Sequence, residues 1–122
     1  MSRVVHFEIP ADNCGRAEKF YAEIFGWKFQ KFPGPQDYWL INTGPNEKPG
    51  INGGLLPRPH PGAPVVNTIQ VEDLNQSLNA VAKHGGKTVV PRMAIPGVGH
   101  LAYCLDTEGN TFGMMQPDAS AR

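Results

Sequence analysis

The first half of the chain alternates apolar and polar residues over short stretches, with one helical pattern between them. Residues 4–9 place apolar side chains at every second position, which is typical of a strand with one buried face. Asp12 or Asn13 is then suited to cap a helix that ends at Gly26. Further strands are predicted over residues 27–32, 38–42 and 51–56. The first half therefore reads as βαβββ.

The second half repeats this plan. A strand is predicted over residues 65–71, Asp73 caps a helix, and Gly85 and Gly86 close it. Three more strands are predicted over residues 87–90, 100–105 and 111–116. Gly26 and Gly86 lie 60 residues apart, and apolar residues align with apolar ones at this separation. We therefore expect an α+β fold built from two βαβββ modules.

A proline-rich stretch separates the two modules. Residues 57–64 contain four prolines and can continue neither a helix nor a central strand. We expect one domain over residues 1–122, with module 1 at about 1–56, the linker at 57–64 and module 2 at about 65–117.

Composition narrows the functional classes. The 11 basic and 11 acidic residues cancel, so nucleic acid and anionic membrane are poor candidates as partners. The sequence has no long apolar run and no signal-peptide pattern at its start, so a cytoplasmic location is expected. Cys14 and Cys104 lack metal-site spacing and are interpreted as small buried hydrophobic residues.

Several motifs resemble those of the vicinal oxygen chelate superfamily, which includes glyoxalase I, bleomycin resistance proteins and extradiol dioxygenases. The matching motifs are His6-Phe-Glu-Ile9, Phe20-Tyr21, Phe25-Gly26-Trp27, Gly85-Gly86 and Asp106-x-Glu-Gly-Asn110. The resemblance implies a cupped mixed sheet around a cavity, with the helices on the outer face, commonly completed by dimerisation. A homodimer is therefore expected.

The resemblance also implies where a divalent metal would bind, because metal-dependent members use one residue in the first and last strand of each module. These positions fall on His6, Gly53, Val66 and Gly113. Only His6 offers a ligand atom, whereas a transition metal typically needs three or four protein ligands. We expect no metal cofactor, and this argues against true lactoylglutathione lyase and extradiol dioxygenase chemistry. A divalent metal rebuilt around His6, Glu8 and His100 is the alternative.

Strand alternation predicts which side chains face the cavity. If His6 points inward, Glu8 does too, and Val66, Thr68 and Gln70 share that face on the equivalent strand of the second module. Leu55 and Met115 are expected on the same face as Gly53 and Gly113, because each lies two residues further along its strand. His100 follows a flexible loop and is expected at the rim of the cavity. One of Tyr38 and Trp39 should face inward, and Trp39 is a candidate to stack on a flat ligand. His60 and His84 are expected to be solvated.

These residues suggest a small-molecule pocket with a few orienting hydrogen bonds. The leading hypothesis is a protein that binds a small organic molecule without a metal, as bleomycin resistance proteins do. One alternative is a lyase or isomerase in which His6 and Glu8 act as acid and base. A third is a non-catalytic accessory module with a vestigial cavity and a protein partner. Metal content and a ligand screen distinguish the three.

Overall fold

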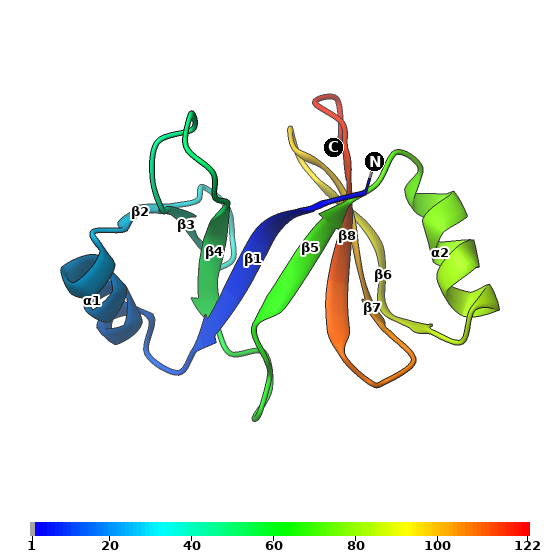
Figure 1. The fold of residues 1–122 in the computed structure, drawn as a ribbon, viewed down its shortest axis with the longest axis horizontal. Coiled ribbons are helices and arrows are strands. Elements are labelled where there is room, and N and C mark those ends of the chain that lie inside the picture. Colours follow the sequence, from blue (N-terminus) through cyan, green and yellow to red (C-terminus); the bar gives the residue numbers. More distant parts are fainter. Residues whose placement is uncertain (1) are drawn as a thin grey trace. The chain divides into compact units, whose positions relative to one another are not determined.

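The computed structural model describes residues 2–122 and divides into two compact units. The first module is His6–Val65, and the second module is Val66–Arg122 together with residues 2–5. The chain runs through β1 (Val4–Ala11), α1 (Cys14–Phe25), β2 (Lys28–Lys31), β3 (Trp39–Asn42), β4 (Asn52–Pro57), β5 (Val66–Gln70), α2 (Leu74–Lys83), β6 (Lys87–Ile95), β7 (Gly99–Leu105) and β8 (Thr111–Pro117) (Figure 1). The predicted α+β class and the two βαβββ modules are confirmed.

The strands of the first module follow the order β2, β3, β4, β1. Strand β1 pairs with β4 in parallel, with Glu8 opposite Gly54. The pairs β3–β4 and β2–β3 are antiparallel. This mixed pairing follows from the connections, because a loop alone joins each pair of antiparallel neighbours, whereas the parallel pair is separated by α1 and two strands.

Helix α1 begins and ends as its sequence predicts. The Asn13 side chain caps the helix by accepting a hydrogen bond from the backbone N–H of Arg16 at 2.9 Å. Gly26 ends it in the left-handed conformation, with φ of 73°, and its N–H donates to the carbonyl oxygen of Ala22.

The core of the first module lies between α1 and one face of its sheet. It consists of Ala11, Ile41 and Leu55, with partly buried apolar side chains packed around them. The apolar stripe of α1 is wider than this contact. Phe20, Ile24 and Phe25 remain 54%, 56% and 58% exposed.

The second module has the strand order β5, β8, β7, β6, with β5 and β8 parallel. The Asp73 side chain caps α2 by accepting from the backbone N–H of Gln76. Apolar residues between α2 and the sheet form its core, which comprises Val71, Leu74, Ala102, Cys104 and Met114. No helix among residues 2–122 combines the length and the apolar character needed to cross a membrane.

Two strands extend beyond their predicted ends. Strand β1 continues through Pro10 to Ala11, two residues beyond the alternating pattern of residues 4–9. Strand β6 runs past Pro91 to Ile95, with register irregularities on both sides of Val90. A bulge leaves residues outside the regular ladder, which is where a proline is tolerated in a strand.

Candidate functional site

Residues of the first module divide cleanly between the two faces of its sheet. Phe7 and Ile9 pack into the core beneath α1. His6 and Glu8 alternate with them and therefore lie on the opposite face. We call this opposite face the polar face of the first module.

Tyr38 joins His6 and Glu8 on the polar face. Its hydroxyl donates a hydrogen bond to Oε2 of Glu8 at 2.8 Å, and Nε2 of His6 lies 2.8 Å from the same hydroxyl oxygen. Glu8 is only 8% exposed, although it faces away from the apolar core. A buried carboxylate is stabilised by such a hydrogen bond and is costly without one. Three residues from two separate segments thus form one directed hydrogen-bond chain.

Gly54 makes room for this arrangement. A Cβ atom at this position would collide with the hydroxyl and ring of Tyr38. Gly54 is also the register partner of Glu8 in the neighbouring strand. The phenol therefore crosses the sheet directly over a position that lacks a side chain.

Burial affects the protonation of His6. The pKa of its imidazole is lowered from the ordinary value of 6.5, because burial penalises the charged form, while the nearby Glu8 carboxylate opposes that change. Near neutral pH the ring is therefore mainly neutral. A neutral histidine in contact with a buried tyrosine–carboxylate pair can accept a proton or a hydrogen bond.

The last-strand position of the first module was assigned to the wrong residue. Gly53 faces the core, where an added Cβ would lie 2.6 Å from the ring of Phe7. Glu8 pairs with Gly54, 46 residues later, whereas Thr68 pairs with Gly113, 45 residues later. Equivalent residues of the two modules are therefore 60 positions apart on the first strands, as for Glu8 and Thr68, and 59 positions apart on the last strands. Gly54 is the equivalent of Gly113.

The same register difference displaces Leu55. It was expected to share the polar face, but it is fully buried in the core beneath α1. Trp39 also packs against this core, with the ammonium of Lys31 5.1 Å from its ring centroid. The expectation that Trp39 faces the polar side is therefore wrong, and Tyr38 contacts His6 and Glu8 there instead.

Predicted site residues of the second module occupy the face away from α2. Thr68 is buried and pairs with Gly113, and Gln70 pairs with Met115. The neighbouring Ile69 packs against the core on the α2 side, so these residues lie on the opposite face. Their participation in a common pocket with His6 and Glu8 stays a prediction.

His100 does not belong to that face. It pairs with Gln116, whose side-chain oxygen accepts a hydrogen bond from the backbone N–H of Leu74 at the start of α2. Its Nε2 lies 3.1 Å from Oδ2 of Asp118. The expectation that His100 lines the cavity is therefore wrong, because strand alternation places it on the α2 side with a carboxylate partner of its own.

The inherited metal positions carry too few donor atoms. Val66, Gly54 and Gly113 offer no ligand atom, and Nε2 of His6 is engaged with Tyr38. Within residues 2–122 the structure groups no three histidine, cysteine or acidic side chains as a metal site. This donor set does not fit a resident divalent ion.

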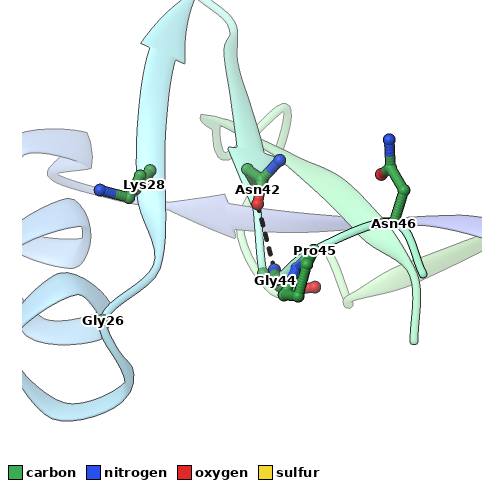
Figure 2. A pocket seen from close by; sticks show the side chains of 7 residues that line it. Gly26, Lys28, Asn42, Gly44, Pro45 and Asn46 are labelled. Atoms are coloured by element: carbon green, nitrogen blue, oxygen red, sulfur yellow. Dashed lines mark hydrogen bonds between the residues drawn. The ribbon is translucent and has the colours of Figure 1, made fainter. Parts of the chain in front are cut away.

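Two surface depressions lie elsewhere on the first module. One, of about 310 Å³, is lined by Lys28, Asn42 and the loop that follows β3. Figure 2 shows the side-chain oxygen of Asn42 bound to the N–H of Gly44, while Lys28 and Asn46 point away from that turn. The polar groups therefore do not converge on a ligand there.

The other depression, of about 360 Å³, lies beside the start of α1 and includes Phe20 and Arg58. The guanidinium of Arg58 already bonds to Asp12 and to the carbonyl oxygens of Pro10 and Ala63. Arg58 thus fastens the proline-rich linker to the end of β1.

Comparison with known proteins agrees with this architecture. Residues 3–44 match the family model described as bleomycin resistance protein-like N-terminal. A glyoxylase-like domain-containing protein of Didymella fabae is 36% identical over 111 residues, covering 85% of each chain. The chain belongs to the glyoxylase-like proteins of the vicinal oxygen chelate superfamily.

Other relatives are more distant or longer. CFP32 of Mycobacterium bovis, whose name assigns it to the glyoxylases, is 30% identical over 106 residues, and the match spans 40% of its length. Methylmalonyl-CoA epimerase from Mycobacterium tuberculosis has a similar fold, with a TM-score of 0.71, 12% identity, and coverage of 94% of this chain and 87% of that chain. A methylmalonyl-CoA epimerase in complex with methylmalonyl-CoA gives a TM-score of 0.72 at 12% identity, covering 98% and 97%. These structures share the fold of this glyoxylase-like chain.

Sequence reasoning left the choice between Tyr38 and Trp39 open, favoured Trp39 as the ligand contact, and missed Gly54. The Gly53-Gly54 pair was visible, but its register with β1 was not. Tyr38 lies one residue before β3, outside the regular alternation that would have fixed its direction.

Proposed function

We propose that this glyoxylase-like protein binds a small organic molecule on the polar face of the first module, oriented by His6, Tyr38 and Glu8. The observation that carries the proposal is the directed hydrogen-bond chain built on the side of the sheet away from the core. Glu8 is buried within this chain, and Gly54 leaves room for the phenol of Tyr38. Neither feature belongs to the core beneath α1. Polar groups arranged in this way supply orientation in small-molecule sites.

The test is a ligand screen on the intact protein by ¹H–¹⁵N NMR at a temperature where every variant is folded. Binding should shift resonances of β1 and β4 and should be lost in Tyr38→Phe. Tyr21→Phe is the matched control, because it also removes a tyrosine hydroxyl from the first module. The ring of Tyr21 remains and keeps its stacking and edge contacts. Hits unaffected by Tyr38→Phe would refute the site. Absence of any hit would favour an accessory module.

We further propose that this binding requires no resident metal ion. The donor set at the inherited positions supports this proposal. Metal analysis of the purified protein should find no stoichiometric zinc, nickel, iron or manganese, and treatment with EDTA should leave both the Tm and ligand binding unchanged. Loss of either after chelation would contradict it.

A second candidate is an isomerase, which one observation favours. The neutral His6 imidazole, backed by Tyr38 and Glu8, is arranged to take a proton from a carbon next to a carbonyl and return it. Several proteins of similar fold are methylmalonyl-CoA epimerases, which supports testing this class of reaction.

The assay is deuterium uptake in D₂O, followed by mass spectrometry. Candidate thioesters and ketones, including methylmalonyl-CoA, are incubated with the protein, and any that is a substrate should exchange α-hydrogen for deuterium. His6→Gln should abolish the uptake, and Tyr21→Phe should not. Uptake that persists in His6→Gln would exclude His6 as the base.

A further inference from the structure

The hydrogen bonds of the site have a fixed direction. A tyrosine hydroxyl carries one proton, and Tyr38 donates it to the Glu8 carboxylate. The same oxygen therefore accepts its hydrogen bond from Nε2–H of His6. In the neutral imidazole the other nitrogen, Nδ1, then carries the lone pair.

Nδ1 of His6 is the open end of this chain. Among residues 2–122 the imidazole has one hydrogen bond, through Nε2 to Tyr38. No side-chain nitrogen or oxygen in this part of the chain is both buried and without a partner, so Nδ1 reaches solvent. The site offers an acceptor to an incoming molecule.

The charges on the polar face also disfavour an anionic ligand. Glu8 is two residues from His6 on the same strand, and its carboxylate repels a bound anion. On this face His6 of β1 pairs with Asn52 of β4, and Asn42 of β3 pairs with Lys28 of β2. Lys28 lies at the far edge, three strands away, which is roughly 14 Å at the usual strand spacing. No strand cation of this module lies next to His6.

We infer that the site selects its ligand through a hydrogen-bond donor, and that it takes neutral or cationic small molecules whose O–H or N–H group binds Nδ1 of His6. This inference rests on the proposed binding function and adds the ligand class to it, and turnover of the anionic methylmalonyl-CoA in the isomerase assay would contradict it. A carboxylate ligand would place its acceptor oxygens against Nδ1 of His6, which is also an acceptor, and near the negative charge of Glu8. A donor completes the chain from ligand to His6, Tyr38 and Glu8.

The first test is the tautomer of His6, read from the ¹⁵N shifts and couplings of its imidazole in the full-length protein. Spectra of His6→Gln identify its signals among the four histidines. The Nε2–H form is expected in the wild type, and Tyr38→Phe should shift the population toward the Nδ1–H form. A wild-type Nδ1–H tautomer would overturn the inference.

The second test uses phenol, anisole and benzoate as probes, since they share a ring and differ in the group offered to Nδ1. Phenol should move the His6 Nδ1 resonance, and anisole and benzoate should bind at least about fivefold more weakly, which corresponds to one hydrogen bond. Lys28→Ala, a matched change farther along the same face, should leave phenol binding unchanged.

The outcomes separate the two proposals. Benzoate that shifts His6 at concentrations equal to or below those of phenol would overturn the ligand class and leave the proposed site standing. If neither these probes nor the screened molecules shift any resonance of β1 or β4, the proposed function fails, and the ligand class with it.

Discussion

Removing one oxygen atom from Tyr38 tests whether the hydrogen-bond chain exists in solution. Tyr38→Phe keeps the ring and deletes the group that lies 2.8 Å from both His6 Nε2 and Glu8 Oε2. Because the ring remains, no cavity large enough to complicate the result is created. The change therefore removes both of these hydrogen bonds.

The expected loss follows from the partners. A hydrogen bond to a charged group contributes about 1.5 to 3 kcal/mol and a neutral one about 0.5 to 1.5 kcal/mol. Both are part-buried here, so the lower half of the summed range applies, and we expect the free energy of unfolding to fall by about 2 to 3 kcal/mol. In urea this corresponds to a midpoint shift of about 1 to 2 M for a chain of this size.

Equilibrium urea unfolding, followed by far-UV circular dichroism and tryptophan fluorescence, measures this loss. Tyr21→Phe is expected to change the free energy of unfolding by less than about 0.5 kcal/mol, because the half-buried ring and its stacking contacts remain. An equally small change in Tyr38→Phe, with an unchanged m-value, would refute the reasoning. In that case the chain of hydrogen bonds would not be formed in the folded protein.

Three further predictions concern other parts of the molecule. Gly54→Ala should displace the phenol, abolish ligand binding and lower stability about as much as Tyr38→Phe does, whereas Gly53→Ala should lower the Tm through its contact with Phe7 and leave the Tyr38 hydrogen bonds in place; thermal melts and the His6 tautomer read by NMR together distinguish the two. The pKa of Asp118 is lowered from 3.8 to about 2 by hydrogen bonds from Ser120 and then His100, so its contribution to stability is present above pH 3.8 and is lost as the pH falls toward 2. Asp118→Asn should therefore cost more stability at pH 6 than at pH 2, and an equal cost at both would contradict this assignment. Light scattering should give twice the 13.3 kDa chain mass for the predicted homodimer, and a monomer mass at micromolar concentration would refute it.

Local patterns in the sequence predicted most of the secondary structure. The caps at Asn13 and Asp73, and the left-handed glycine at Gly26, depend on interactions within a few residues, and the structure contains all three. The duplicated plan was also readable, because each module repeats the same order of periods. Strand ends at Pro10 and Pro91 were less predictable, since pairing with neighbouring strands decides where a strand stops.

The candidate site shows where sequence reasoning reached its limit. Alternation alone placed His6 and Glu8 on one face, because both lie on the same strand and their spacing is local. Placing Gly54 required the register between β1 and β4, which differs by one residue from the corresponding register in the second module. A shift of one residue reverses the face of every side chain on a strand, so Gly53 and Leu55 fell on the wrong side.

The sequence by itself determined the two βαβββ modules, the family to which the chain belongs, and a histidine and a glutamate on a common strand face. The tertiary structure decided that Tyr38 joins them and that a glycine makes room for its phenol. The physical reason is that periodicity and capping are properties of neighbouring residues, whereas the meeting of Tyr38 and Glu8 depends on packing between segments 30 residues apart. Only that packing converts two polar side chains into a directed hydrogen-bond chain with an open acceptor.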